Sequence, residues 1–143
     1  MSDPSWTWNS DRTIPSDTGA GRQLVDELLE QLNGANWDEQ EVFGIHLAFE
    51  EALVNAIKHG NRHDATKSVH VVCKLTSDLV RLEIRDEGAG FDPEAVPDPT
   101  EEENLEVPSG RGLMLMRSFM SMVEYNDTGN YVVMEKRRAE QVS

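Results

Sequence analysis

The stretch FGIHLAFEEALVNAIKHG, from Phe43 to Gly60, decides how the rest of this chain folds. Its apolar residues recur at helical spacing, and the pattern begins just after Asp38, a residue type that caps helices. Glu41 follows Asp38 by three positions, which matches a capping box. The sequence therefore predicts a long helix that runs to Gly60. Its apolar residues are Val42, Phe43, Ile45, Leu47, Phe49, Leu53, Val54 and Ile57.

A strand and a helix are predicted before this segment. The residues from Trp6 to Ile14 begin with apolar and polar side chains in alternation, which is typical of a strand, and the following Pro15 favours the edge of a sheet. From Thr18 onward apolar residues recur at helical spacing, and Gly34 follows as a stop signal. This second pattern predicts an amphipathic helix.

Two hairpins and a short helix are predicted after Gly60. The strand segments are rich in β-branched and apolar residues and are separated by short polar turns. A chain of 143 residues with these elements is expected to form one domain, residues 1–143, in which helices lie on a sheet. The expected segments are the strands Val69–Leu75 and Leu79–Arg85, a helix from Gly112 to Phe119, and the strands Met122–Tyr125 and Tyr131–Glu135.

The charge of the chain restricts its partners. The formal net charge is −14 and the pI is near 4.5, which argues against a duplex nucleic-acid binder, because such proteins need clustered Lys and Arg. A protein or another cationic partner is favoured instead. No run approaches the 18 apolar residues of a membrane span, and the N-terminus lacks a signal-peptide profile, so we expect a cytoplasmic protein. Cys73 is alone in an apolar run, which favours a buried thiol.

An acidic segment separates the two predicted hairpins. Between Asp92 and Pro108 four prolines and seven acidic residues occur without one Lys or Arg. A stretch of 17 residues without periodic structure is unusual inside a compact domain unless it is a lid or a binding segment. We expect a mobile lid over about residues 92–109. Its charge either selects a partner or is merely solvated.

Glu51 and Asn55 are the first candidate site residues. They lie four positions apart, so on a helix they are about 40° from each other and one turn apart. Lys58, three residues further on, is expected on the same face. An Asn carbonyl suits magnesium when phosphate oxygens and water supply the other ligands, and a nearby carboxylate can take a proton from a hydroxyl. Alone, such a pair is more often a solvated helix face.

Asp86 closes a predicted strand and is followed by Glu87, Gly88, Ala89 and Gly90. The two glycines permit close backbone approach to a ligand. A carboxylate there can accept a hydrogen bond from the amino group of adenine. Guanine carries a carbonyl at that ring position, so we expect a preference for adenine of about 1–3 kcal/mol. An isolated DEGAG sequence is otherwise a strand-ending turn.

The third candidate segment is SGRGLMLM, from Ser109 to Met116. Its amides at Gly110 and Gly112, together with a helix N-terminus, can point at phosphate oxygens, and Arg111 adds positive charge. Leu113 completes the set of candidate nucleotide contacts, although a leucine in such a position is more often a core residue.

The order of EALVNAIKHGN, DEGAGFDP and SGRGLMLM is similar to the N, G1 and G2 boxes of the GHKL ATPases, a group that contains gyrase, MutL and histidine kinase catalytic domains. The motifs cover roughly residues 43–116, and the flanking strands fit the same fold. The resemblance implies an α/β two-layer sandwich with a mixed, mainly antiparallel sheet covered on one face by helices. It also implies ATP and Mg²⁺ as ligands.

Within this group the chain resembles the small RsbW-type anti-sigma serine kinases. The resemblance implies that Glu51 is the general base and that Asn55 binds magnesium. It assigns Asp86, Gly88 and Gly90 to the adenine pocket, and Gly110, Arg111 and Gly112 to the phosphates. The implied partners are a STAS-type anti-sigma-factor antagonist, which is phosphorylated on serine, and a sigma factor.

Three alternatives stay open at this point. The chain is a serine kinase, a binding module that uses ATP only as a structural ligand, or a detached histidine kinase catalytic domain that acts in trans. Glu51 favours the first, whereas Pro108 and Ser109, which stand where related kinases often carry a basic residue, favour the second. Trp6, Trp8 and the first strand are a candidate homodimer surface, and a monomer is the alternative.

Overall fold

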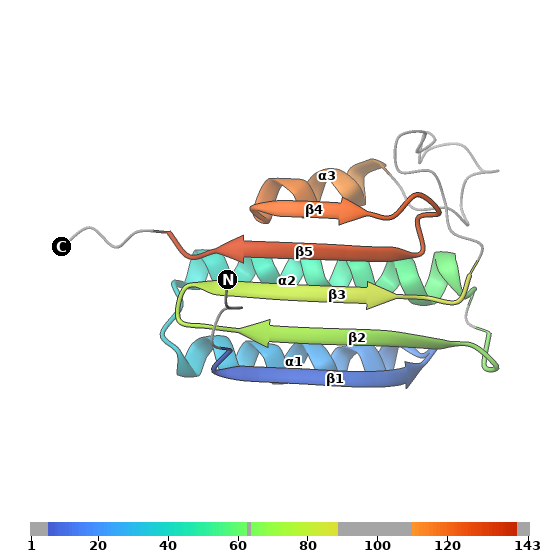
Figure 1. Ribbon diagram of the computed structural model, residues 1–143, viewed down its shortest axis with the longest axis horizontal. Coiled ribbons are helices and arrows are strands. Elements are labelled where there is room, and N and C mark those ends of the chain that lie inside the picture. Colours follow the sequence, from blue (N-terminus) through green and yellow to red (C-terminus); the bar gives the residue numbers. More distant parts are fainter. Residues whose placement is uncertain (1–5, 63, 89–109, 140–143) are drawn as a thin grey trace, which may run out of the picture.

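The computed structural model describes residues 6–62, 64–88 and 110–139, and residues 110–112 by their backbone alone. A strand and two helices are followed by a pair of strands, a third helix and a second pair of strands, and a π-helix, η1, directly continues the second helix (Figure 1). In chain order the elements are β1 (Trp8–Pro15), α1 (Thr18–Gly34), α2 (Glu39–Val54), η1 (Asn55–Gly60), β2 (Ser68–Leu75), β3 (Leu79–Arg85), α3 (Gly110–Phe119), β4 (Met122–Tyr125) and β5 (Tyr131–Arg137).

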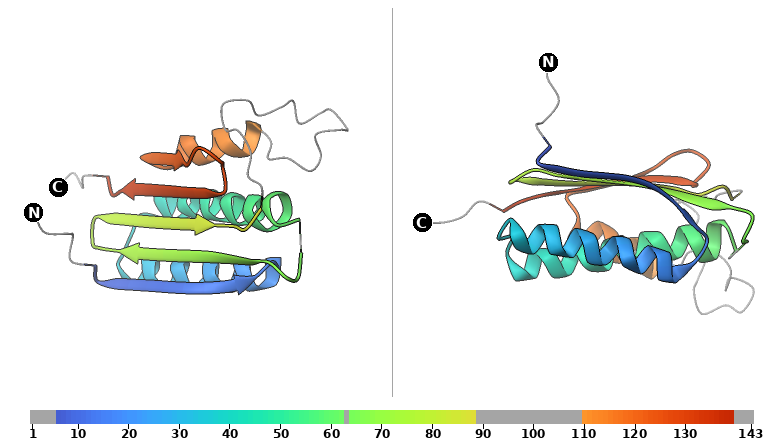
Figure 2. Two further views of the ribbon diagram at one scale, coloured as in Figure 1. Left: turned by 45° about the vertical axis from the view of Figure 1, so that its right-hand side comes forward. Right: turned by 90° about the horizontal axis from the view of Figure 1, so that it is seen from below.

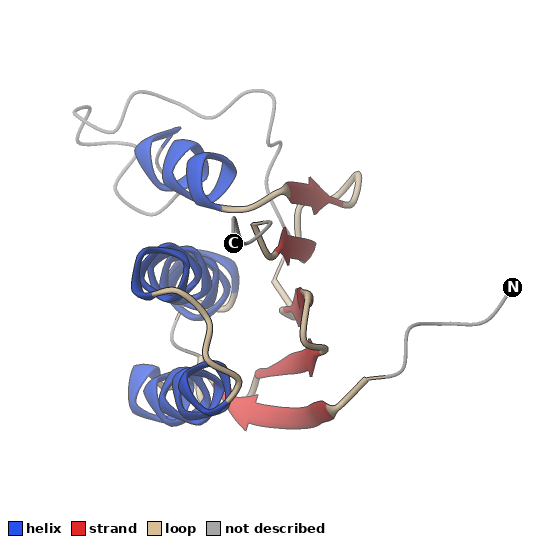
Figure 3. Ribbon diagram, turned by 90° about the vertical axis from the view of Figure 1, so that its left-hand side faces the viewer, coloured by secondary structure: helices blue, strands red, loops and turns tan. Residues whose placement is uncertain are grey.

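The five strands form one sheet in the order β1-β2-β3-β5-β4, and each neighbouring pair is antiparallel. Figures 2 and 3 show all three α-helices on the same face of this sheet. The expectation of a two-layer α/β sandwich is therefore confirmed, with a sheet that is antiparallel throughout the described strands. β1 lies at one edge of the sheet, as the proline at its end indicated.

The hydrophobic core lies between the two layers. It contains alternate residues of the strands, because successive side chains of a strand point to opposite faces. Phe49 of α2, Leu28 of α1 and Leu82 of β3 are all completely buried in this core. Cys73 is also buried, and burial raises the pKa of its thiol to about 12. The opposite face of the sheet carries polar side chains, such as Arg81, which binds Glu83 and Glu135 at 2.9 and 2.7 Å.

The predicted starts of the first two helices are correct, but one detail of the capping is wrong. Asp38 caps α2 by accepting a hydrogen bond from the amide of Gln40 at 3.2 Å. Glu41, expected to complete a capping box, instead accepts a hydrogen bond from the backbone amide of Ala139 at 3.0 Å. The Glu41 carboxylate is bound by the C-terminal segment and not by the first turn of its own helix. A local sequence pattern cannot predict such a distant partner.

The predicted long helix changes type where the candidate magnesium ligand stands. The α-helical part ends at Val54, and residues 55–60 form the π-helix η1. The amide of Asn61 closes it by bonding to the carbonyl of Ala56, five residues earlier, at 2.8 Å. Single π-helical turns are rare and often occur at functional sites.

The end of β5 is anchored to distant parts of the chain through Arg138. The guanidinium of Arg138 donates to the carbonyls of Ser77 at 3.0 Å and Asn36 at 2.5 Å, and it lies over the ring of Trp37. Arg138 thereby ties the sheet to the connection between α1 and α2. Separately, none of the helices in the described ranges has the length and apolar character needed to cross a bilayer.

Candidate functional site

Asn55 lies at the junction of α2 and η1, with 7% of its surface exposed. Its Nδ2 atom is buried and lacks a hydrogen bond of regular geometry. A buried polar atom without such a bond is uncommon and requires an explanation, such as a ligand. Glu51 is half-buried in the last turn of α2, one turn before Asn55.

The hydroxyl of Tyr125, at the end of β4, marks the point where the candidate residues meet. Burial raises its pKa to about 12. The Asn55 amide opposes this rise because it lies close enough to interact with the hydroxyl, although the geometry falls short of a regular hydrogen bond. The negative charges of Asp86 and Glu51 raise the pKa further. Three residues that are up to 35 positions apart in the chain therefore lie near enough to one hydroxyl to influence its pKa.

Asp86 follows the last residue of β3 and is 8% exposed. Burial raises the pKa of its carboxyl group to about 6, against the opposing effects of a hydrogen bond from Gly88 and the charge of Lys67. The Gly88 amide donates to Oδ1 at 2.8 Å, and the Asp86 amide donates to the carbonyl of Asn130 at 2.9 Å. This carboxylate is thus held in place, and it has more acceptor sites than the one bond from the described residue Gly88 uses.

Two glycines form a tight cradle around Asp86. A Cβ atom at Gly60 would lie 2.5 Å from the carboxyl carbon of Asp86. A Cβ atom at Gly88 would lie 1.9 Å from the carbonyl oxygen of Gly60. Both distances are too short for any side chain, so the two positions require glycine. The end of η1 and the turn after β3 therefore pack backbone against backbone.

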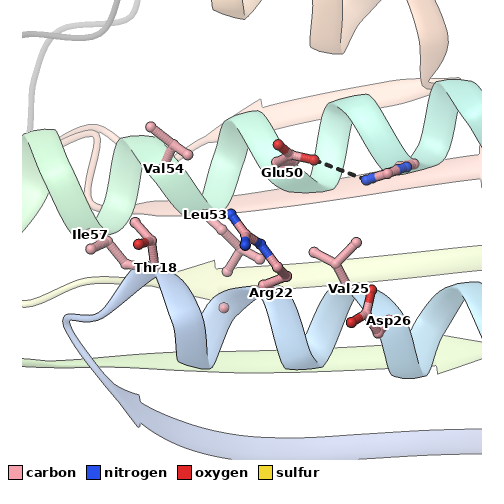
Figure 4. Close-up of a pocket in the computed structure, with 10 residues that line it drawn as sticks. Thr18, Arg22, Val25, Asp26, Glu50, Leu53, Val54 and Ile57 are labelled. Carbon is pink, nitrogen blue, oxygen red and sulfur yellow. Dashed lines mark ion pairs between the residues drawn. The ribbon is translucent and has the colours of Figure 1, made fainter.

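Two neighbouring acids, Glu50 and Glu51, have different surroundings. Glu50 is exposed and pairs with His46, one turn earlier on α2, at 2.9 Å. It lies along a groove of about 270 Å³ between α1 and α2, which is also lined by Arg22 and Leu53 (Figure 4). Glu50 therefore pairs with a residue outside the candidate site, whereas Glu51 is close enough to raise the pKa of Tyr125.

A family model described as a histidine kinase-like ATPase domain matches residues 14–136. The chain belongs to this family. It is a GHKL-type ATPase domain with RsbW-like relatives, as the three sequence boxes indicated. The resemblance stated from the sequence is confirmed at the level of family and fold.

Named relatives narrow the group of ATPase domains to which the chain is similar. It is 31% identical to the serine/threonine-protein kinase BtrW of Bordetella bronchiseptica over 107 residues, which are 72% of this chain and 75% of the relative. It is 32% identical to an anti-sigma F factor of Clostridium perfringens over 125 residues, 83% of this chain and 86% of the relative.

A solved structure supports the fold. The crystal structure of the RsbU and RsbW domains of a Mycobacterium tuberculosis protein aligns with a TM-score of 0.62 at 19% identity. The alignment covers 92% of this chain and 32% of the longer chain. At this identity the likeness shows the fold alone.

The remaining predicted site residues of the ATPase domain are placed as follows. Lys58 is exposed, whereas Asn55 is buried, because the wider turn of η1 separates their directions. Leu113 is 3% exposed and packs in the hydrophobic core. Gly110, Arg111 and Gly112 form the first turn of α3, so the helix begins two residues before the predicted start at Gly112. Gly90 and the predicted lid, residues 92–109, lie outside the described residues.

Sequence reasoning missed three residues of the site, namely Gly60, Asn61 and Tyr125. The end of the predicted helix already accounts for Gly60, so its sequence position indicates no further role. A tyrosine at the end of a strand carries no functional signal by itself. Only the antiparallel pairing of β4 with β5, and of β5 with β3, brings Tyr125 towards Asp86. Because Tyr125 and Asp86 are far apart in the sequence, the sequence alone does not show that they lie close together in the fold.

The arrangement fits ATP and Mg²⁺ by two features. Asn55 supplies a buried amide at the junction of α2 and η1, and its Oδ1 is the atom that can ligate Mg²⁺, since Nδ2 can only donate. The close packing of Gly60 and Gly88 holds the Asp86 carboxylate at a fixed position next to η1. An amide oxygen is a suitable magnesium ligand, and a carboxylate oxygen is a suitable acceptor for an adenine amino group.

Proposed function

We propose that this ATPase domain is an anti-sigma serine kinase, which transfers the γ-phosphoryl group of ATP to a serine of a STAS-type anti-sigma-factor antagonist. The observation that carries the proposal is that Glu51 and Asn55 lie one turn apart where α2 meets η1, while Gly60, at the end of η1, packs directly against Asp86. The names of two relatives, a serine/threonine-protein kinase and an anti-sigma F factor, support it.

Each site residue has a distinct task in this proposal. Asp86 accepts a hydrogen bond from the adenine amino group, and Gly88 holds the carboxylate in the required direction. The backbone amides at the start of α3, residues 110–112, bind phosphate oxygens, where the positive end of the helix dipole favours anions. Asn55 would hold Mg²⁺, which, when bound, neutralises phosphate charge.

The chemical step needs a base and correct positioning. The Glu51 carboxylate takes the proton from the partner's serine hydroxyl while the serine oxygen forms a bond to the γ-phosphorus and the bond to the ADP oxygen breaks. The products are phosphoserine and ADP. Catalysis depends mainly on alignment and charge compensation.

Partner exchange is the regulatory part of the proposal. The unphosphorylated antagonist occupies the kinase, and its phosphorylation releases the kinase to bind a sigma factor. Residues 92–109, which lie outside the described residues, are proposed to cover the nucleotide as a lid within a single domain. The net charge of −14 favours partners with a positive surface.

A homodimer through the first strand stays a prediction. β1 is an edge strand, which provides backbone groups for pairing with a second copy. Its tryptophans contribute less exposed surface than expected, since Trp8 packs against the core and Trp6 lies under the ammonium of Lys74 at 5.7 Å.

The kinase proposal is tested by incubating the protein with Mg-ATP and a STAS-domain partner encoded nearby, and then measuring phosphoserine by mass spectrometry. Glu51→Gln should reduce the rate by about 10²-fold or more, since it removes the general base. Glu50→Gln is the matched control and should leave the rate near that of the wild type. Equal rates for Glu51→Gln and the wild type would refute the assigned base.

The main rival is a binding module that sequesters a sigma factor and holds ATP without using it. Pro108 and Ser109 favour this rival because they supply no positive charge before the second glycine box. ATP binding without any phosphoserine would support it. Acid-labile phosphohistidine on the partner would instead identify a histidine kinase domain that acts in trans.

A further inference from the structure

Asn61 is a buried residue that no part of the proposed chemistry uses. Its side chain is 0% exposed, although asparagine is usually found at the surface. Each of its polar groups has a partner within the protein. A fully satisfied polar network of this kind fixes a local structure, whereas a partly satisfied one would cost stability.

The side chain of Asn61 joins the ends of three strands. Its Oδ1 accepts a hydrogen bond from the amide of Glu87, after β3, at 2.8 Å. Its Nδ2 donates to the carbonyl of Ser68, the first residue of β2, and to the hydroxyl of Ser16, after β1, both at 2.9 Å. Ser16 in turn donates to the carbonyl of Lys67 at 2.9 Å.

Two further contacts strengthen this junction. The Glu87 carboxylate accepts a hydrogen bond from the amide of Ser68, so Asn61 and Glu87 together bind both backbone groups of Ser68. Arg62, next to Asn61, has a φ of 53°, a conformation that side chains other than glycine rarely adopt. The chain accepts this cost directly beside the buried network.

The position of Asn61 connects the two halves of the candidate site. Its backbone amide closes η1, the element that begins with Asn55 and ends with Gly60. Its side chain holds the residue that separates Asp86 from Gly88. Since Gly60 packs directly against Asp86 and Gly88, a shift of Glu87 would move the Asp86 carboxylate relative to η1.

We infer that Asn61 is a positioning residue that locks the turn Asp86–Gly88 against η1 and thereby sets the selectivity of the site for adenine nucleotides. This inference rests on the proposed function for the identity of the ligand. Asn61 itself touches no nucleotide. It acts through Glu87, and its amide is required because it both donates and accepts hydrogen bonds.

Two substitutions and one control test the inference. Asn61→Asp keeps the acceptor for Glu87 but loses the donor to Ser16 and Ser68, and Ser16→Ala removes only one partner of that donor. Thr76→Ala is the control, because Thr76 accepts hydrogen bonds from the amides of Asp78 and Leu79 at the opposite end of β3. It removes comparable hydrogen bonds away from the site.

The first measurement is calorimetric titration of each folded variant with Mg-ATP and Mg-GTP. Asn61→Asp should lower the ratio of ATP to GTP affinity at least tenfold, and Ser16→Ala should lower it about threefold. Thr76→Ala should keep the wild-type ratio even if it lowers the melting temperature. An unchanged ratio in both Asn61→Asp and Ser16→Ala would overturn the inference.

The second measurement needs no nucleotide and distinguishes the inference from the proposed function. In amide NMR spectra, Ser16→Ala and Asn61→Asp should shift the signals of Glu87 and Gly88, while Thr76→Ala should not. Unshifted signals would overturn the inference while leaving ATP binding by the wild type intact. A wild type that binds neither nucleotide would instead refute the proposed function, whatever the NMR spectra show.

Discussion

At the scale of single residues, the carboxyl group of Asp86 is strongly changed by its surroundings. Burial raises its pKa from 3.8 to about 6. Because the pKa in the folded protein lies above its ordinary value, the protonated form is favoured by folding. The stability that this group contributes is fully present below about pH 4 and is lost as the pH rises through about 6.

The first prediction concerns this pH dependence. Asp86→Asn should increase the free energy of unfolding of the nucleotide-free protein at pH 7.5 by roughly 1 kcal/mol, a value reduced for partial solvent screening. At pH 4 the substitution should have little effect, because the wild-type carboxyl group is then protonated. Urea unfolding at both pH values measures the difference. A gain of the same size at pH 4 would show that charge burial is not the cause.

The second prediction concerns the glycine cradle. Gly88→Ala should reduce the free energy of unfolding by about 2–4 kcal/mol, since the new Cβ atom would lie 1.9 Å from the Gly60 carbonyl oxygen. Gly34→Ala, at the end of α1, is the matched control because no atom lies within 4 Å of its Cβ position. Chemical denaturation compares both variants with the wild type, and equal losses would contradict the role of close packing.

At the scale of helices and strands, the contact between α2 and α3 depends on Gly44. A Cβ atom there would lie 2.8 Å from the ring of Phe119, which is in edge-to-face contact with Phe43. The same α3 supplies the predicted phosphate-binding amides of residues 110–112. The packing of one glycine therefore affects the position of the helix that the proposed site requires.

The third prediction follows from this packing. Gly44→Ala should lower the free energy of unfolding by about 1–3 kcal/mol and should weaken ATP binding, because α3 must move away from α2. Gly21→Ala in α1 is the control, since its nearest neighbour, in the side chain of Ile57, lies at an ordinary distance of 3.4 Å. Thermal unfolding and calorimetric titration measure the two effects. If Gly44→Ala bound ATP as well as the wild type, the proposed role of α3 in nucleotide binding would be contradicted.

The elements were largely predictable from the sequence because their signals are local. The periodic apolar residues of α1 and the caps at Asp17 and Asp38 depend only on nearby positions. The π-helical turn was not predictable, since it depends on the bonds that Asn61 makes with distant strands. The acceptor role of Glu41 was missed for the same reason, because its donor is the amide of Ala139.

At the scale of the whole molecule, Arg138 connects parts of the chain that are far apart in sequence. It bonds to the connection after α1 and to the turn between β2 and β3, and it also packs over Trp37. Since these contacts join both layers of the fold, their loss should lower the stability of the entire domain rather than loosen one strand.

The fourth prediction is that Arg138→Ala lowers the free energy of unfolding by about 1–3 kcal/mol, because the carbonyls of Ser77 and Asn36 lose a charged donor and Trp37 loses its packing partner. Arg137→Ala, at the neighbouring exposed position, should change it by less than about 0.5 kcal/mol. Urea unfolding followed by tryptophan fluorescence measures both. Similar values for the two variants would contradict a specific anchor at Arg138.

The motifs of the candidate site were predictable from the sequence, but the spatial arrangement of their residues was not. Glu51 and Asn55 are one helical turn apart, so their proximity follows from local geometry. The approach of Asp86 to both, and the presence of Tyr125 between them, depends on the order of the strands in the sheet. No pattern in a single sequence specifies that order. Whether the assembled residues bind ATP stays a prediction.

The position of β5 between β3 and β4 has a consequence for biosynthesis. The amide of Asp86 is held by the carbonyl of Asn130, so the proposed adenine side of the site is complete only once residue 130 has been synthesised. A nascent chain that has released the N-terminal helices still lacks this support. A chain that stops before residue 130 should therefore bind nucleotide more weakly than one that includes β5.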